Sequence, residues 1–222
     1  MRLPDSPEER GLCLTPPASL GTPLAMYASP LLLASASPRR RDLLERAAVA
    51  FEVRPANVLE RREPGEPPAL FARRLALAKA RAVAQTAGAS PPRLVLGADT
   101  IVVIDAEVLG KPANAEHAVE LLSRLVGRTH RVITAVAVVE SASQYARHAV
   151  VESSVSMRPA SAEEVRAYVA TGEPLDKAGA YAVQGVGRRF VEKIEGSESN
   201  VIGLPMEETL ALLREAGWQA SP

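Results

Sequence analysis

The feature that most constrains the fold of this chain is the alternation of short apolar runs with segments of helical periodicity. Apolar runs of strand length occur at 31–34, 93–98 and 101–104. Residues 129–139 and 146–157 are rich in β-branched side chains and are predicted to pair as a long hairpin. Between these runs, hydrophobic residues recur at helical spacing. This pattern predicts a three-layer α/β domain with a mixed sheet.

The helices are predicted from start signals and from buried stripes. Pro38–Ala48 begins with proline after Ser37, which suits the N-cap position. Residues 69–84 form the longest predicted helix, with an inward stripe made of Phe71, Leu75, Ala78 and Ala82. Later helices are predicted after the N-cap Asn114, at the capping box that begins with Ser161, and at 206–216.

The composition excludes several kinds of protein. The 222 residues carry 26 Lys and Arg against 26 Asp and Glu, so no net field attracts nucleic acid or an anionic membrane. No apolar run approaches the roughly 20 residues of a membrane span. Cys13 is the single cysteine, which allows neither an internal disulfide nor a cysteine metal site. We therefore expect a globular, cytoplasmic protein without nucleic-acid or membrane partners.

The first residues differ from the rest of the chain. Residues 1–27 contain Pro and Gly without sustained periodicity, which predicts a flexible tail before a single domain at 28–218. Met26 lies just ahead of the first predicted strand and is a natural start for that domain. The tail is either a genuine extension or an overlong assignment of the start.

The start of the first predicted helix is electrostatically unusual. Arg39, Arg40 and Arg41 lie in its opening turn, where the helix dipole already places partial positive charge. A strand, a serine-containing turn and a helix N-terminus together form a geometry that binds phosphate. Ser35 and Ser37 add hydroxyl donors to this turn. The competing interpretation is a basic helix start whose side chains turn away into water.

Asp99 is the second unusual residue, because it lies inside an apolar run. A carboxylate in such a place needs a charged partner, a metal or a raised pKa. Mg²⁺ fits, since it binds carboxylates together with substrate phosphates. The alternative is an aspartate at a β-bend that accepts hydrogen bonds from local amides. Thr100 points to the opposite face if the chain stays extended.

Four isolated polar residues complete the set of candidates. Lys79 borders the inward stripe of the long helix, and Lys111 follows a strand in a Gly-Lys-Pro loop. Each lysine alone is typical of a protein surface, but both suit a polyphosphate site if they converge with the arginines. Gln184 lies in a small-residue segment, where its amide can donate to and accept from a base. Glu60 is a carboxylate in an otherwise basic loop.

Six segments occur in an order and at spacings that resemble one family. They are LASASPRRRDLL, LALAKARAVA, LGADTIVVIDAEVLGKP, LSRLVGRTHRVITAVAVV, PLDKAGAYAVQG and EGSESNVIGLPMEETLALL. The chain thereby resembles the Maf family of nucleoside triphosphate pyrophosphatases, also called septum formation inhibitor Maf, from about Pro30 to Gly217. The resemblance implies an α/β fold with an elongated mixed sheet and a nucleotide-binding cleft. It also implies hydrolysis of a nucleoside triphosphate to the monophosphate and pyrophosphate with Mg²⁺ or Mn²⁺, and a homodimer.

The resemblance also implies roles for individual residues. Ser35, Arg39 and Arg40 match the phosphate-binding loop of the family, and Ser37 lies in the same loop. Asp99 matches the presumed proton acceptor, and it would hold the metal together with Glu60. Lys79 and Lys111 match the remaining polar residues of the cleft, which we count as catalytic with Asp99 and Glu60. Substrate choice is associated with the positions of Arg39, Thr100 and Gln184.

The motifs SPRR, GADT and AVQG look like the subgroup that acts on dTTP, UTP and modified pyrimidine nucleotides. This implies a house-cleaning role against non-standard nucleotides. Ala182 and Glu198 depart from the family pattern, where a glycine and an aromatic residue are frequent. Two alternatives stay open: a pyrophosphatase for 7-methyl-GTP or another purine nucleotide, and a nucleotide-sensing binding protein that regulates cell division.

Overall fold

The computed structural model describes Tyr27 and residues 30–219. Nearly all of the predicted tail lies outside these described residues. Tyr27, at its end, is buried and forms an isolated parallel bridge with Trp218. The two ends of the described chain therefore meet beside the core.

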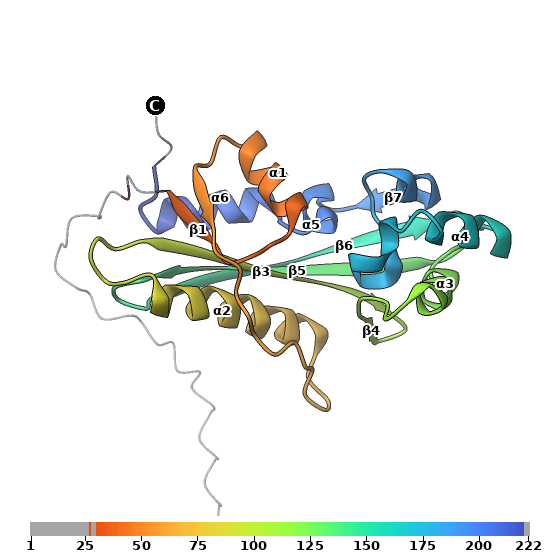
Figure 1. Ribbon diagram of the computed structural model, residues 1–222, viewed down its shortest axis with the longest axis horizontal. Coiled ribbons are helices and arrows are strands. Elements are labelled where there is room, and N and C mark those ends of the chain that lie inside the picture. The colour runs from red at the N-terminus through yellow and green to blue at the C-terminus, as the bar shows by residue number, and fades with distance from the viewer. Residues whose placement is uncertain (1–26, 28–29, 220–222) are drawn as a thin grey trace, which may run out of the picture.

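The molecule is elongated and is built on one mixed sheet, whose long strands run along its longest axis (Figure 1). The strand order is β2-β1-β3-β5-β6-β7, and β4 also pairs with β3. β1 is parallel to β2 and to β3, whereas the other pairs are antiparallel. The strands are β1 (Leu31–Leu33), β2 (Phe51–Val53), β3 (Leu94–Ile104), β4 (Glu107–Leu109), β5 (Thr129–Glu140), β6 (Ala146–Met157) and β7 (Val191–Glu195).

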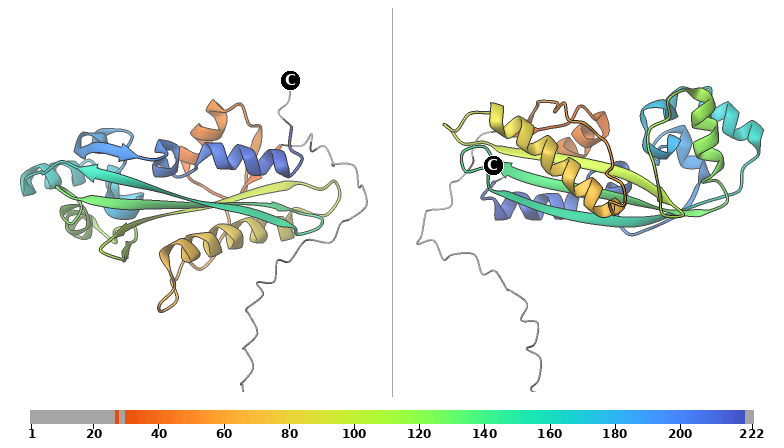
Figure 2. Two further views of the ribbon diagram at one scale, coloured as in Figure 1. Left: turned by 180° about the vertical axis from the view of Figure 1, so that it is seen from behind. Right: turned by 90° about the horizontal axis from the view of Figure 1, so that it is seen from below.

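Helices cover both faces of the sheet, as Figures 1 and 2 show. Helix α2 (Pro68–Thr86) lies on one face, while α1 (Pro38–Arg46), α5 (Glu198–Ile202) and α6 (Met206–Glu215) lie on the other. The far end carries α3 (Ala115–Ser123), α4 (Ala162–Val169) and three short 3₁₀ helices, η1 (Glu173–Asp176), η2 (Ala178–Ala180) and η3 (Val186–Phe190). The predicted three-layer α/β fold with an elongated mixed sheet is confirmed.

The long helix α2 buries a different stripe from the predicted one. Its buried residues are Phe71, Ala72, Leu75, Ala76, Lys79, Ala80, Val83 and Ala84, so the prediction was wrong for Ala78 and Ala82. The reason lies in the sheet. Gly97 of β3 has no side chain, and a Cβ there would come within 2.3 Å of the Ala76 carbonyl oxygen. The helix therefore packs closely against β3, with Ala76 and Ala80 over the glycine and Lys79 on the buried face.

Several local predictions are confirmed, and others need correction. Asn114 and Ser161 cap α3 and α4 through their side chains, and Ser161 forms the full capping box with Glu164. Ser37 occupies the N-cap position of α1, but its side chain makes no capping hydrogen bond. The two apolar runs around Asp99 form the single strand β3 without a bend. Sequence patterns did not identify β4 and α5, which have only three and five residues.

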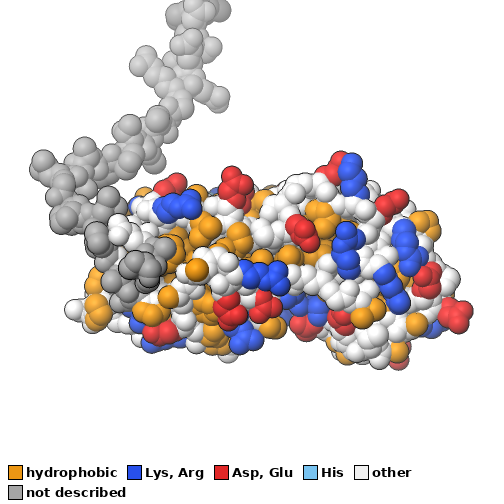
Figure 3. All heavy atoms as spheres, turned by 90° about the horizontal axis from the view of Figure 1, so that it is seen from above, with side chains coloured by type: hydrophobic (Ala, Val, Ile, Leu, Met, Phe, Trp, Pro, Cys, Tyr) orange, Lys and Arg blue, Asp and Glu red, His pale blue; other side chains and the backbone are white. Residues whose placement is uncertain are grey.

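Two further features concern the helices and the charged surface. None of the helices within the described residues is both long and apolar enough to cross a membrane. Acidic and basic side chains are interspersed over the face drawn in Figure 3, where neither sign dominates.

His130 of β5 is expected to make the protein less stable in mild acid. It is 2% exposed, its Nε2 lies 2.7 Å from the Tyr181 hydroxyl, and burial lowers its pKa to about 4. The unfolded chain binds a proton from about pH 6.5 downward that the folded protein takes up only near pH 4. The free energy of unfolding should therefore fall by about 2 kcal/mol from this group between pH 7 and pH 5.

Urea unfolding at pH 7 and pH 5 measures this effect. The variant His130→Asn should lose less stability on acidification than the wild type, whereas His148→Gln, which alters an exposed histidine of β6, should lose as much. Equal acid sensitivity in the wild type and His130→Asn would contradict this expectation.

Candidate functional site

A cleft opens where the edge of β3 loses its neighbouring strands. β1 pairs with β3 at Val95 and Leu96, and β4 pairs with it at 102–104. Between these pairings, residues 97–101 of β3 have β5 on one side and no other described strand on the opposite side. The cleft has a volume of about 590 Å³ and reaches residues on both faces of the strand. This gap explains how adjacent residues of one strand can contribute to a single site.

All ten residues proposed from the sequence line this one cleft. They come from the turn before α1, the start of α1, the loop before α2, α2 itself, β3, the loop after β4 and the segment after η2: Ser35, Ser37, Arg39, Arg40, Glu60, Lys79, Asp99, Thr100, Lys111 and Gln184. Their convergence is a property of the fold alone, since these elements are spread over most of the chain.

An ion-paired triad lies on the α2 side of β3. The Lys79 ammonium is 2.7 Å from Asp99 Oδ1 and 2.5 Å from Glu60 Oε1. Lys79 and Asp99 are buried, with 9% and 6% of their surface exposed, whereas Glu60 is exposed. The alternative interpretation of Asp99, as a bend residue satisfied by local amides, is wrong because its partner is Lys79. The close packing of α2 on Gly97 brings this lysine within reach.

The two carboxylates of the triad differ in their protonation properties. Burial raises the pKa of Asp99, and the nearby Lys79 and Arg40 only partly offset this. Burial also acts against ionisation of Glu60, but its hydrogen bond and charge contact with Lys79, together with Lys111 and Arg40, lower its pKa overall. Asp99 thus takes up a proton more readily than an ordinary aspartate, which suits a group that accepts a proton during a reaction.

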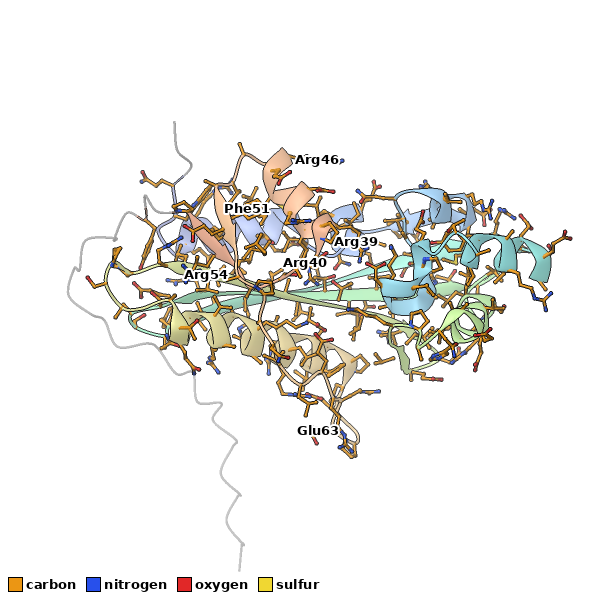
Figure 4. The ribbon with its side chains drawn as sticks, viewed as in Figure 1. Arg39, Arg40, Arg46, Phe51, Arg54 and Glu63 are labelled. Carbon is orange, nitrogen blue, oxygen red and sulfur yellow. The ribbon has the colours of Figure 1, made fainter. Side chains whose placement is uncertain are left out.

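The three arginines at the start of α1 lie in three different environments. Figure 4 shows Arg39 and Arg40 at the sheet end of the helix. Arg40 is buried and donates to Ser35 Oγ at 3.0 Å, Thr100 Oγ1 at 3.1 Å and the Gly203 carbonyl at 2.8 Å. These bonds use three of its five N–H groups and leave two for a ligand. Arg39 pairs with Asp176 at 3.5 Å, and Arg41 is exposed and is absent from the cleft lining.

The turn before α1 presents several hydrogen-bond donors to the cleft. The Ser37 side chain does not cap the helix, so it leaves the N–H groups of the first turn free of that bond. Ser35 Oγ accepts from the Ser37 amide at 3.2 Å and from Arg40, which holds the turn in place. Free helix N–H groups next to two guanidinium groups attract phosphate oxygens. The phosphate-binding interpretation therefore has geometric support over a solvated helix start.

Residues of η1 and η2 also line the cleft, together with Lys111 and Gln184. Sequence patterns missed two charged residues here, Asp176 and Lys177, which also line the cleft. Lys177 donates to Asp176 Oδ1 at 2.5 Å and also to the Glu173 carbonyl. The only signal for them was the charged Asp-Lys pair just before the small-residue segment. Together they add one ammonium and one carboxylate, paired with each other, to the lining of the cleft.

The residues present fit a divalent cation that is completed by substrate. Asp99 and Glu60 converge on one point, now held by the Lys79 ammonium, and each has a second carboxylate oxygen. Among the residues that the structure describes, no group of three or more His, Cys, Asp or Glu could hold a metal alone. Mg²⁺ is commonly bound by one or two carboxylates with substrate phosphates and water. The donor set suits that arrangement.

The two departures from the family pattern leave the site intact. Ala182 lines the cleft without a positive φ, so the missing glycine causes no backbone strain. Glu198 starts the short helix α5 after the capping residue Ser197. An acidic residue is favourable in this first turn.

Comparison with known proteins supplies the family. Residues 30–216 match the family described as Maf-like protein. A relative from Anaeromyxobacter dehalogenans (strain 2CP-1 / ATCC BAA-258), named dTTP/UTP pyrophosphatase, is 52% identical over 85% of this chain and 94% of its own length. Proteins of the same name from Burkholderia lata and Escherichia coli O157:H7 are 47% and 50% identical, over 88% and 82% of this chain and 96% and 91% of their own lengths.

A crystal structure of a nucleoside-triphosphatase / dITP/XTP pyrophosphatase from Mycobacterium abscessus covers 58% of this chain and 74% of its own. Its identity of 18% and TM-score of 0.33 are too low to support an argument. The family match spans nearly all of the described domain, and the curated relatives share about half of its residues. The chain belongs to the Maf family.

Proposed function

We propose that this chain hydrolyses dTTP, UTP and modified pyrimidine nucleotides to the monophosphate and pyrophosphate. The observation that carries the proposal is the ion-paired triad of Asp99, Lys79 and Glu60, which lines one cleft together with the arginine-rich start of α1. A proton acceptor beside a polyphosphate site is what attack by water on a phosphorus atom needs. The names of the curated relatives supply the expected substrates.

The positions of the charges suggest how the nucleotide lies. The phosphates would bind at the start of α1, against Ser35, Ser37 and the two cleft arginines, with Lys111 on the facing wall. The base would then extend along the cleft toward Gln184, whose amide can both donate and accept. Thr100 would lie between the phosphate end and the base end of the cleft. Its hydroxyl accepts a hydrogen bond from Arg40 and lies 3.0 Å from the Thr134 hydroxyl.

The chemical step would be hydrolysis at the α-phosphorus. Asp99 would accept a proton from a water molecule, whose oxygen forms the new bond to that phosphorus. The bond from the phosphorus to the oxygen that bridges to the β-phosphorus breaks, and pyrophosphate leaves. Lys79, Lys111 and the cleft arginines would stabilise the charge that develops on the phosphate oxygens. Mg²⁺ or Mn²⁺ held by Asp99 and Glu60 would neutralise phosphate charge when bound.

The biological role follows from the substrate. Hydrolysis of all dTTP and UTP would be wasteful, so we propose that the enzyme removes non-standard pyrimidine nucleotides from the cytoplasmic pool. The homodimer that the resemblance implies stays a prediction.

A panel of nucleoside triphosphates tests the proposal directly. With Mg²⁺ or Mn²⁺, release of pyrophosphate should be fastest for dTTP, UTP and modified pyrimidine nucleotides. The variant Gln184→Glu should lower kcat/KM for dTTP by about tenfold or more, because a carboxylate cannot donate to the base. Faster turnover of 7-methyl-GTP than of dTTP would favour the purine alternative. Nucleotide binding without any metal-dependent turnover would favour the regulatory binding protein.

A further inference from the structure

Two residues behind the cleft wall, Glu173 and Tyr168, hold the loop that carries Gln184. Glu173 Oε1 accepts from the Gly187 amide at 2.9 Å, and its Oε2 accepts from the Val186 amide at 2.9 Å. The Tyr168 hydroxyl donates to Glu173 Oε1, also at 2.9 Å. Neither residue lines the cleft itself. They therefore bind the backbone of the loop from behind and are not among the residues that line the cleft.

The same pair also holds the other end of the loop. The Ala182 amide donates to the Tyr168 hydroxyl at 3.3 Å. Tyr168 is fully buried, with its ring edge-on to Phe190 at a centroid distance of 5.3 Å. One buried hydroxyl and one carboxylate thus bind the backbone on both sides of Gln184. Only residues 183–185 lie between the anchored amides of Ala182 and Val186, so Gln184 at their centre has little backbone freedom.

The glycines of the loop are needed for this contact. Gly185 has a φ of +82°, and a Cβ there would lie 2.6 Å from Glu173 Oε2. A Cβ on Gly187 would lie 2.5 Å from the Tyr168 hydroxyl oxygen. The close approach of backbone to carboxylate and phenol therefore explains why the sequence reads Gln-Gly-Val-Gly at this point. The loop is built around the Glu173 carboxylate.

The carboxylate is held in its ionised form. Burial disfavours the charge of Glu173, but the amides of Gly187 and Val186, the Tyr168 hydroxyl and the nearby Lys177 together lower its pKa. Hydrogen bonds from N–H and O–H donors to an ionised acceptor are stronger than neutral ones. An amide at this position could accept only through one oxygen and would turn its NH₂ group toward a donor.

We propose that Glu173 and Tyr168 are positioning residues that hold the loop Ala182–Gly187, so that Gln184 can distinguish pyrimidine from purine bases. This inference rests on the proposed function, in which Gln184 contacts the base. A side chain discriminates by hydrogen bonding only if its own position is fixed, because a mobile amide adapts to either base edge. The pair should therefore control base selectivity and leave the phosphate end of the cleft unaffected.

The experiment compares base selectivity with binding at the phosphate end. For the wild type, Glu173→Gln, Tyr168→Phe and Gln184→Ala, kcat/KM is measured with dTTP and with GTP, and inorganic pyrophosphate is tested as an inhibitor. Both positioning variants should lower the dTTP-to-GTP ratio on the order of tenfold, mainly through KM for dTTP. Their inhibition by pyrophosphate should stay at the wild-type level. Glu163→Gln, which alters an exposed glutamate in the first turn of α4, is the matched control.

The double variant Glu173→Gln/Gln184→Ala separates positioning from general stability. Glu173→Gln should not change the ratio further when Gln184 is already absent. Three results would overturn the inference. Glu173→Gln could lower the dTTP-to-GTP ratio by the same factor in the Gln184→Ala protein as in the wild type. The positioning variants could lose inhibition by pyrophosphate to the same extent as selectivity, or both could keep the wild-type ratio. Tyr168→Phe keeps the buried ring and serves alone if Glu173→Gln does not fold, as judged by circular dichroism.

Failure of the proposed function would look different. A wild-type ratio in Gln184→Ala would show that Gln184 does not select the base, and the inference would fall with that role. An absence of turnover on every nucleoside triphosphate by the wild type would reject the activity itself. Loss of selectivity in Gln184→Ala but not in the positioning variants would reject only the inference.

Discussion

Replacing Asp99 with asparagine is expected to lower pyrophosphate release from dTTP by about 10²- to 10⁴-fold, the usual contribution of a general base. The amide keeps the shape of the side chain but cannot accept the proton of the attacking water. Lys79 would keep its ion pair with Glu60, so its charge would not be left without a partner. The fold should therefore persist, with a thermal unfolding midpoint close to that of the wild type.

The matched control is Asp105→Asn. Asp105 is exposed, follows the last residue of β3 and forms an ion pair with Arg128. This variant should retain wild-type turnover. Steady-state kinetics with saturating Mg²⁺ or Mn²⁺ provide the measurement for both proteins. Unchanged turnover by Asp99→Asn would reject the role of this residue as the proton acceptor.

Replacing Gly97 with alanine is expected to destabilise the protein by about 3 kcal/mol, at the upper end of the usual cost of overpacking. The added Cβ would meet the Ala76 carbonyl oxygen at 2.3 Å and the Ala80 amide nitrogen at 2.7 Å. Both atoms belong to the backbone of α2, so the whole helix must move away from β3. The move should lengthen the ion pair between Lys79 and Asp99, and activity should fall with stability.

Urea unfolding of Gly97→Ala measures the first effect, and turnover of dTTP at a temperature where the variant stays folded measures the second. Gly110→Ala is the control for stability, because a Cβ at Gly110 meets no atom within 4 Å. A wild-type unfolding midpoint in Gly97→Ala would show that α2 does not rely on this close approach.

Local sequence signals predicted most of the architecture because the interactions behind them are local. Caps such as Asn114 and Ser161 bond to amides within their own first turn. The hairpin of β5 and β6 could likewise be predicted, since its strands are adjacent in the chain. The short elements β4 and α5 carry too few residues to show a period. They form because β4 pairs with β3 and because α5 packs against β5 and β6.

The candidate site was predicted in its residues but not in its arrangement. The six segments that resemble the Maf family contain nine of the ten positions, and Glu60 lies in the loop between the first two segments. Only the structure shows that Arg40 donates hydrogen bonds to Ser35, Thr100 and Gly203. Arg39 instead forms an ion pair with Asp176. The sequence pattern does not give the partners of these two neighbours, because Thr100, Gly203 and Asp176 come from distant parts of the chain.

By itself, the sequence determined the alternating α/β elements, the unusual basic helix start and the presence of a carboxylate within an apolar strand. Each depends on neighbours within a few residues. The tertiary structure decided which side of α2 faces the sheet, because the missing Cβ of Gly97 lets the helix pack closely and buries Lys79. It also decided where the cleft lies, since β1 and β4 pair with separate parts of β3 and leave the edge around Asp99 open. Periodicity within one segment cannot contain either fact, because both arise from contacts between segments.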